Sequence, residues 1–444
     1  MNNRRVVIIG AGFAGISAAR EFAGNAVDVL LLDRNNYHTF LPLLHQVVTC
    51  ELEPEHIICP IRKLIQTQPN VQFATNEVKR VDFVSQVVET NNCLIHYDYL
   101  VLACGSTSQF FGIPGVSEYS FSLKNLEDSV ILRNQIVSCF ELAQEEADIC
   151  RRQELLTFTI VGGGATGVEL AGELAELIYG TLVNDYPVIN FRQVRVVLLQ
   201  AGDKLLPEMP LRLSVYAKRQ LQKMGVEVKV ASRVAKVMEN AVYWENSHFK
   251  DLHFKDLQAI PCRTVIWTAG VCGNPVAKKW GLVTDSNGKV TVLPTLQVPE
   301  YPQVYIVGDL AAPQNEQLPM LAPVATQQGA TAARNILRHI KGKNPQPMRY
   351  QHQGSMVIIG RHAAVVNLFG KVNLTGFVAW LLWLFVHLAF LPSTRNRFHV
   401  LLNWLWSYFS RDRSVRLILP LYPASKSNPA TQSTSDNNKR VEIN

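Results

Sequence analysis

Two stretches of the chain share one pattern of apolar and polar positions. In residues 5–32 an apolar β-branched run, a glycine-rich turn, a helical stretch and a second apolar run follow one another. Residues 155–199 repeat this order. Short apolar runs bounded by glycine and separated by helical stretches are typical of parallel strands joined by crossover helices. The pattern therefore predicts an α/β fold class with two Rossmann-like units.

The first glycine turn has the spacing of a dinucleotide-binding loop. Gly10 permits a tight turn, Gly12 lets the backbone approach a pyrophosphate, and Gly15 lets the following helix pack closely on the strand. The helix N-terminus adds unpaired N–H groups and the positive end of its dipole. The strand at residues 27–32 ends on Asp33, whose carboxylate can accept hydrogen bonds from a ribose. This context makes the loop a specific signal for a bound dinucleotide.

The second glycine turn has the same spacing, at Gly162, Gly164 and Gly167. Two such sites in one chain imply two dinucleotides, commonly a bound flavin and an exchanging nicotinamide nucleotide. Here the second strand ends on Gln200 instead of an acid. A carboxylate there would repel a 2′-phosphate, whereas an amide bonds the ribose hydroxyl without that repulsion. We therefore expect tolerance of NADPH alongside NADH; an unchanged preference is the alternative.

The basic surplus of the chain belongs to its C-terminal end. The net charge is +7, and from Lys371 onward nine basic residues stand against three acidic ones. Such a surplus indicates a nucleic-acid partner or an anionic lipid surface. The long apolar stretches beside it favour lipid, and we expect no nucleic-acid partner.

Two apolar stretches lie within this basic end. Residues 376–391 carry no charge apart from a titratable His387 and would span about 24 Å as a helix, less than the ~30 Å hydrocarbon core of a bilayer. Residues 398–409 form the second stretch. Aromatic and basic residues suited to a membrane surface are Trp380, Trp383, Trp404, Trp406, Arg395, Arg397, Arg411, Arg413 and Arg416. The pattern predicts amphipathic helices inserted into one anionic leaflet; a buried core or dimer helix and a single spanning helix are the alternatives.

The eight cysteines show no C-x-x-C pair and no disulfide or metal-ligand spacing. This usage indicates free thiols in a reducing compartment, and no metal site is predicted. Dithiol–disulfide reductases need a close cysteine pair beside the flavin, and the segment after Asp33 offers only Cys50 and Cys59. The sequence therefore disfavours that class.

An ordered series of motifs is similar to that of a known family, the type II NADH:quinone oxidoreductases, over about residues 4–419. These are single-subunit, non-pumping dehydrogenases of respiratory and photosynthetic membranes. The motifs are residues 36–47 (NYHTFLPLLHQV), 159–173 (TIVGGGATGVELAGE), 265–270 (VIWTAG), 318–329 (LPMLAPVATQQG) and 376–390.

The resemblance implies a two-dinucleotide-binding flavoprotein fold. In such proteins a Gly-Asp pair at a strand end places a carboxylate on the flavin, which assigns Asp309 and the N-terminal loop to FAD. The implied units are 1–112 with 293–370 for FAD, 113–292 for NAD(P)H and 371–420 for membrane association, and the composition of 421–444 indicates a disordered tail. The implied cofactor-binding residues are Gly10, Gly12, Gly15, Asp33, Arg34, Gln46, Gly105, Gly308, Asp309, Gly162, Gly164, Gly167, Gln200 and Gly270.

Three residues are implied to take part in quinone reduction. The resemblance puts Glu169 between nicotinamide and quinone, as a positioning group or a proton relay; the alternative is an acid favoured near a helix N-terminus by the dipole. Gln327 and Gln328 fall where the family has a glutamine near the quinone and the flavin ring; a helix packed on the flavin is the alternative. Pro323 replaces the first glutamine of the commonest family motif and removes its amide donor.

The implied activity is hydride transfer from NAD(P)H to FAD, followed by transfer of two electrons to a membrane quinone without proton pumping. Alternatives are reduction of a biosynthetic naphthoquinone such as a phylloquinone precursor, sulfide:quinone oxidoreduction, and a non-catalytic FAD/NAD(P)H redox sensor. We expect a homodimer bound peripherally to the reducing-compartment face, cytoplasmic or thylakoid, of an energy-transducing membrane. Because a strand begins at Arg4, no signal peptide is expected.

Overall fold

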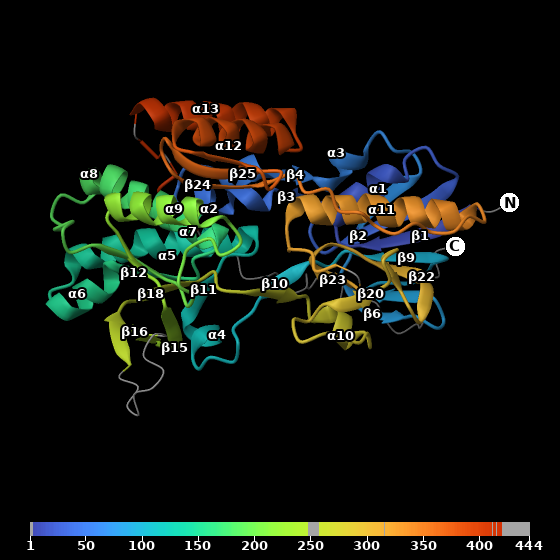
Figure 1. Ribbon diagram of the computed structural model, residues 1–444, viewed down its shortest axis with the longest axis horizontal. Coiled ribbons are helices and arrows are strands. Elements are labelled where there is room, and N and C mark those ends of the chain that lie inside the picture. Colours follow the sequence, from blue (N-terminus) through green and yellow to red (C-terminus); the bar gives the residue numbers. More distant parts are fainter. Residues whose placement is uncertain (1–2, 247–256, 315, 411, 414, 420–444) are drawn as a thin grey trace, which may run out of the picture.

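The computed structural model describes residues 3–246, 257–314, 316–410, 412–413 and 415–419. Two α/β units lie side by side along the long axis of the molecule (Figure 1). Two helices near the C-terminus, α12 and α13, lie together along one side (Figure 1). The predicted fold class, α/β with two Rossmann-like units, is confirmed.

The first unit contains a six-stranded sheet in the order β21-β22-β9-β1-β2-β5. Every neighbouring pair is parallel except β21 with β22. The chain returns late in the sequence to add β22 beside β9, so Gly308 and Asp309 follow a strand at the same edge of the sheet as the Gly10 turn. The strands are β1 (Arg4–Ile9), β2 (Val27–Asp33), β5 (Val71–Thr75), β9 (Tyr99–Leu102), β21 (Gln297–Val298) and β22 (Tyr301–Ile306).

Helices α1 (Phe13–Glu21) and α11 (Ala322–Ile340) pack closely against each other over this sheet (Figure 1). The contact depends on Gly329, because a Cβ there would collide with the Ala14 backbone. The contact with α1 therefore holds the first half of α11, which carries Gln327 and Gln328.

The second unit contains a five-stranded parallel sheet in the order β11-β18-β12-β13-β14. Its strands are β11 (Ser120–Ser122), β12 (Thr157–Val161), β13 (Arg195–Leu199), β14 (Val226–Lys229) and β18 (Thr264–Trp267). Helix α7 begins directly after the second glycine turn and continues into a π-helical segment. The helices are α5 (Leu126–Glu145), α6 (Ile149–Leu155), α7 (Ala165–Glu176), the π-helix (Leu177–Leu182), α8 (Val183–Asp185) and α9 (Leu211–Lys223).

Smaller sheets and short helices connect the two units and cover their edges. An antiparallel ladder of β10 and β19 joins segments that follow the two nucleotide sheets. The small strands are β3 (Tyr37–Thr39), β4 (Ile58–Pro60), β6 (Val78–Asp82), β7 (Val87–Thr90), β8 (Leu94–His96), β10 (Ser106–Ser108), β15 (Ser232–Met238), β16 (Ala241–Asn246), β17 (Gln258–Pro261), β19 (Val271–Gly273), β20 (Val290–Val292) and β23 (Ala311–Pro313). The short helices are α2 (Leu44–Val48), α3 (Ile61–Ile65), α4 (Val116–Tyr119) and α10 (Val276–Lys279), with 3₁₀ turns at Leu41–Leu43, Pro54–Ile57 and Gly308–Leu310.

Helix α12 rests on a three-stranded antiparallel sheet that in turn packs on α7, and α13 packs on α12 and on the 3₁₀ turn Pro54–Ile57. Ala379 and Trp383 of α12 are buried there, which extends the core of the second unit to the end of the fold. No helix in the described part of the chain is both long and apolar enough to cross a membrane. The elements are β24 (Ser355–Gly360), β25 (Ala363–Leu368), β26 (Val372–Thr375), α12 (Phe377–Phe390) and α13 (Thr394–Ser410).

The four tryptophans of these helices do not share one environment. Trp406 is 61% exposed, and Trp380 is half-buried. Trp383 and Trp404 are buried, with ring centroids 5.9 Å apart. The expectation that all four meet a membrane surface is therefore wrong for these two, because the inner face of each helix completes the protein core.

The arginines after α13 turn back toward the body. Arg413 is buried against acidic side chains, and Arg416 pairs with Asp185 and Asp412. These two are therefore not the lipid-facing charges that the sequence predicted. Arg411 and the predicted tail at 421–444 lie outside the described residues.

Candidate active site

The two glycine loops are open where a ligand must approach. Gly10 and Gly162 have φ values of 104° and 112°, which favour glycine, and a Cβ on Gly10 would collide with the Ala103 carbonyl. By contrast, a Cβ on Gly12 or Gly164 would meet nothing within 4 Å. The backbone is thus exposed at the position where a pyrophosphate approaches, and both loops fit a dinucleotide.

The third glycine of each loop allows the helix that follows to pack closely against the loop. A Cβ on Gly15 would collide with the Gly10 carbonyl, and one on Gly167 with the Gly162 carbonyl. Each helix can therefore begin close against its own loop only because glycine stands there.

Asp33 and Gln200 occupy equivalent places beside these loops. Asp33 Oδ2 accepts a hydrogen bond of 2.7 Å from the Ala11 N–H. Gln200 Oε1 accepts one of 2.8 Å from the Gly163 N–H. Because Oε1 is used by the loop, the Nε2 donor is the part of the Gln200 amide available to a ribose or a 2′-phosphate.

Asp309 lies in a small polar cluster with Ser106 and Lys124. The sequence predicted Asp309 but not the other two. Ser106 Oγ donates to Asp309 Oδ2 at 2.6 Å, and Lys124 Nζ donates to Ser106 Oγ at 3.2 Å. Burial lowers the pKa of Lys124, while the charge of Asp309 raises it. Gly105 and Gly308 both have positive φ and form the turns that bring this cluster together. Lys124 precedes helix α5 in no recognisable motif, so no sequence signal identified it.

The two glutamines of α11 are engaged with the backbone. Gln328 is buried, and its Oε1 accepts a hydrogen bond of 2.6 Å from the Gly308 N–H, next to Asp309. The Gln327 amide forms a pair of 3.0 Å hydrogen bonds with the backbone of Gln351. Gln328 therefore positions the strand-end turn, and Gln327 would have to exchange its Gln351 bonds to reach a quinone.

The remaining predicted cofactor residues differ in position. Gln46 is buried, and its Oε1 accepts a 2.9 Å hydrogen bond from the Trp404 indole, so its amide faces the C-terminal helices. Arg34 is exposed after β2. Gly270 has φ 94°, and a Cβ there would collide with the Phe111 ring.

Glu169 lies where α7, α2 and α12 meet. Its Oε1 accepts a hydrogen bond of 3.4 Å from the Ile358 N–H, and its Oε2 is 3.8 Å from His45 Nδ1. Burial raises the pKa of Glu169 to about 8, so the carboxyl carries its proton at neutral pH. The site thus holds an acid group that can give up a proton inside the protein.

Three ring side chains that the sequence did not assign surround this carboxyl. The His45 and Trp383 ring centroids are 6.0 Å apart, and Trp383 stacks on His387 at 3.9 Å. Burial lowers the pKa of His45 to about 3 and that of His387 to about 4, so both imidazoles are neutral. His387 was visible in the sequence as the single titratable residue of an apolar helix, but periodicity did not reveal which side it faces.

Two family models match the chain. The model described as pyridine nucleotide-disulphide oxidoreductase matches residues 4–329, and the model described as NDH2 C-terminal domain matches residues 352–412. Together with the two glycine loops, this match defines the class as a pyridine-nucleotide-dependent flavoprotein oxidoreductase. All eight cysteines are free thiols, so the chain lacks the disulfide for which the class is named.

Two similar proteins identify the family within this class. Type II NADH:quinone oxidoreductase Ndh of Mycobacterium tuberculosis is 37% identical over 421 residues, which cover 92% of this chain and 89% of that protein. The type II NADH:quinone oxidoreductase of Staphylococcus haemolyticus is 30% identical, with 84% and 92% covered. The chain therefore belongs to the type II NADH:quinone oxidoreductases.

Solved structures agree on the fold. NDH2 from Plasmodium falciparum in complex with NADH is 19% identical, with a TM-score of 0.85 over 94% of this chain and all of that chain. The sulfide:quinone oxidoreductase from Aquifex aeolicus is 18% identical, with a TM-score of 0.70 over 91% of this chain and 95% of that chain. At these identities the likeness is one of fold alone.

Proposed function

We propose that this protein oxidises NAD(P)H and reduces a membrane quinone, with FAD passing the electrons between them. The observation that carries the proposal is the position of the Glu169 carboxyl, which is largely buried beside His45 and the Ile358 N–H. Glu169 lies on the helix that starts at the second nucleotide loop, and Trp383 of the C-terminal helix α12 lies next to it. A proton donor between a nicotinamide site and an apolar surface is what quinone reduction requires, because the product quinol carries two added protons.

Each part of the chain has a role in this reaction. The Gly10 loop, Asp33 and Asp309 would hold FAD, which would supply hydride acceptance and two-electron transfer. The Gly162 loop and Gln200 would hold the nicotinamide nucleotide. Glu169 would hold a proton for the quinone oxygen, and the buried rings around it keep bulk water away from the carboxyl.

The nucleotide preference is expected to be relaxed. The Nε2 donor of Gln200, turned away from the Gly163 N–H, can bond either a 2′-hydroxyl or a 2′-phosphate. An NADH preference above roughly a thousandfold in kcat/KM, about 4 kcal/mol, would contradict this part of the proposal.

The outer face of the C-terminal helices supports peripheral attachment to a membrane. It exposes large apolar side chains, including Phe377, Phe385, Phe390, Phe398, Trp406 and Phe409. Exposed Arg395 and Arg397 lie beside them and suit an anionic lipid surface. An apolar patch of this extent is typical of an interaction surface. The proposal includes no proton pumping.

One experiment tests the function directly. The purified FAD-loaded protein is assayed with NADH and NADPH against ubiquinone, plastoquinone and naphthoquinone analogues. Turnover of at least one quinone on the order of 1–1,000 per second is expected. A selective naphthoquinone rate would favour the biosynthetic role. A flavin that NADH reduces but no quinone reoxidises would favour the redox sensor and overturn the proposal.

The membrane face and the assembly state complete the proposal. We propose a homodimer on the reducing-compartment face of an energy-transducing membrane, cytoplasmic or thylakoid. Analytical ultracentrifugation in detergent tests the dimer, and a monomeric mass would contradict it.

A further inference from the structure

A second group of buried acids lies on the same helix face as Glu169. Glu173 and Glu176 follow Glu169 on α7 at spacings that keep side chains on one face. Glu51, just after α2, completes the group. The exposed fractions of the side chains are 11% for Glu51, 3% for Glu173 and 24% for Glu176. The cluster is therefore largely removed from water.

One arginine from beyond α13 enters this cluster. Arg413 Nη2 lies 2.7 Å from Glu173 Oε2, 3.1 Å from Glu176 Oε2 and 3.6 Å from Glu51 Oε2. Its Nη1 donates to the Thr49 carbonyl at 3.0 Å. Three carboxyl groups thus surround one buried guanidinium.

This arrangement retains a proton at neutral pH. Arg413 Nη2 has both the Glu51 and the Glu173 carboxyl around it, and two such carboxyls can hydrogen-bond to each other only if one is protonated. Burial, with the charge of Glu173, raises the pKa of Glu51 to about 8. Burial likewise raises the pKa values of Glu173 and Glu176, against the opposing charge of Arg413.

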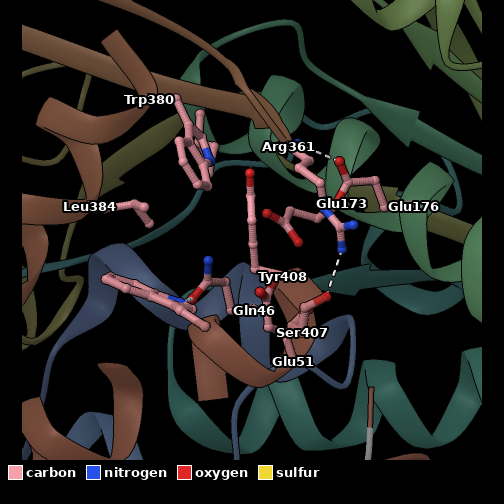
Figure 2. A pocket seen from close by; sticks show the side chains of 11 residues that line it. Gln46, Glu51, Glu173, Glu176, Arg361, Trp380, Leu384, Ser407 and Tyr408 are labelled. Atoms are coloured by element: carbon pink, nitrogen blue, oxygen red, sulfur yellow. Dashed lines mark hydrogen bonds between the residues drawn. The ribbon is translucent and has the colours of Figure 1, made fainter. Parts of the chain in front are cut away.

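A cavity of about 30 Å³ lies beside the cluster. Its walls include Glu51, Glu173, Glu176, Arg361 and Ser407 (Figure 2). Ile358 also lines it, and the Ile358 N–H is the group that bonds Glu169. A polar cavity of this volume has room for one or two water molecules with several hydrogen-bonding partners.

We propose that Glu51, Glu173 and the water-sized cavity beside them form a proton relay that supplies Glu169 during quinone reduction, with Arg413 fixing the charge of the relay. This inference rests on the proposed function. It goes beyond that function by naming the route by which a proton from solution reaches the buried acid.

The balance of the reaction defines what the relay must carry. NAD(P)H and a quinone yield NAD(P)⁺ and a quinol only if one further proton enters from solution. In the final transfer the O–H bond of Glu169 breaks and an O–H bond forms on the quinone oxygen. The Glu169 carboxylate then takes a proton through cavity water from the Glu51–Glu173 pair. That pair is reprotonated from solution past the partly exposed Glu176.

Other titratable or charged groups face the relay from the elements packed around it. These groups are His45 on α2, Cys50 just after it, Arg361 in the β24–β25 turn, His387 on α12, Tyr408 on α13 and Arg413 beyond α13. Burial keeps the two histidines neutral at neutral pH and raises the pKa of the Cys50 thiol to about 11. The carboxyls are therefore the groups here that can gain and lose a proton.

Glu51→Gln and Glu173→Gln test the relay, because each keeps the side-chain shape and removes one acid. Each variant is assayed with NADH and two acceptors. A quinone consumes protons, whereas ferricyanide takes single electrons and none. The relay predicts that quinone reduction slows at least tenfold, while ferricyanide reduction changes by less than twofold. Glu145→Gln, an exposed acid on α5, is the matched control and is expected to leave both rates unchanged.

A spectroscopic readout keeps the test independent of turnover. Infrared difference spectra on reduction of the FAD-loaded protein should contain a protonated-carboxyl C=O band that disappears in Glu51→Gln. Equal slowing with both acceptors, or wild-type quinone rates in both variants, would overturn the relay. A wild-type protein that reduces ferricyanide but no quinone would instead overturn the proposed function. If one variant fails to retain FAD, the other and the infrared band decide the question.

Discussion

Burial controls the chemistry of the single acid side chain closest to the proposed reaction. Glu169 faces neutral imidazoles and an indole, and the described contacts include no cation within ion-pair distance of its carboxyl. Desolvation therefore outweighs the hydrogen bond from the Ile358 N–H and raises the pKa of Glu169 to about 8. The same residue in water would be ionised at neutral pH and could not donate a proton.

The raised pKa of Glu169 predicts a defined pH profile. Below pH 8 the carboxyl is protonated and able to donate, and above pH 8 that form falls about tenfold per pH unit. Quinone reduction should therefore decline on the alkaline side, and Glu169→Gln should slow it by about 10²–10⁴-fold and lose that decline. Stopped-flow kinetics from pH 6 to 9.5 measure both. Unchanged turnover in the variant would rule out the role.

The amide of Gln200 predicts a nucleotide switch. In Gln200→Glu the carboxylate can still accept from the Gly163 N–H, but it places a negative charge against a 2′-phosphate. We expect kcat/KM for NADPH to fall about 10–100-fold, or roughly 1.4–2.7 kcal/mol, with little change for NADH. Steady-state kinetics with both nucleotides measure it, and Gln220→Glu, on α9, is the control. An equal effect on both nucleotides would contradict the assignment.

Local motifs predicted the residues whose role depends on backbone geometry. The glycines of both loops, and the acceptors Asp33 and Gln200, lie where their spacing placed them. Lys124 and His45 could not be predicted in the same way, since each reaches its site through tertiary packing. The amide contacts of Gln327 and Gln328 were equally hidden, because they depend on where Gln351 and Gly308 fold back.

Helices α12 and α13 each have an inner and an outer apolar face. Trp383 and Trp404 point inward, while Phe385 and Trp406 are exposed. The sequence located both helices to within a few residues, because apolar runs and Pro392 mark their limits. It could not separate the two faces, since a helix that is apolar all round gives no periodic signal.

The outer face predicts reversible attachment to lipid. The double substitution Phe385→Asp with Trp406→Asp places charges on exposed positions and leaves the buried face intact. We expect at least a tenfold loss of binding to vesicles that contain anionic lipid, with ferricyanide reduction retained. Vesicle co-sedimentation measures the binding. Wild-type binding by the double variant would contradict attachment through these helices.

A truncation is a weaker test of the same surface. A chain cut before Lys371 loses Ala379, Trp383 and Leu391 from the core shared with the second unit. Removal of buried side chains of this size costs several kcal/mol. We therefore expect such a chain to lose stability together with α12 and α13, so surface substitutions separate the two effects better.

Three segments that are distant in sequence meet in the acidic cluster around Arg413. Residues from α2, α7 and the segment after α13 are held together there by one guanidinium. The sequence pattern assigned Arg413 to the lipid surface because an arginine after an apolar helix is typical of a membrane boundary. Its partners lie far away in sequence, and no local signal connects them.

The cluster predicts a pH-dependent loss of stability in Arg413→Met. Without the guanidinium, the buried carboxylates lack their counter-charge, and unfolding should become easier by about 3–5 kcal/mol at pH 8. Protonation of raised-pKa carboxyls relieves this cost as pH falls toward their unfolded value near 4.5, so the deficit should shrink at pH 5.5. Thermal unfolding followed by flavin fluorescence measures it. A deficit independent of pH would contradict the charge assignment; Arg334→Met, at an exposed arginine, is the control.

The long separation between Thr49 and Arg413 also has a consequence for biosynthesis. The two residues are 364 positions apart, and at about 5–20 residues per second a ribosome needs roughly 20–70 s to make the intervening chain. During that interval a nascent chain can already form both nucleotide sheets while its acidic cluster lacks its cation. The step that completes the cluster also docks α13, so a newly made protein acquires the proposed proton route and the finished apolar surface of its C-terminal helices in one late event.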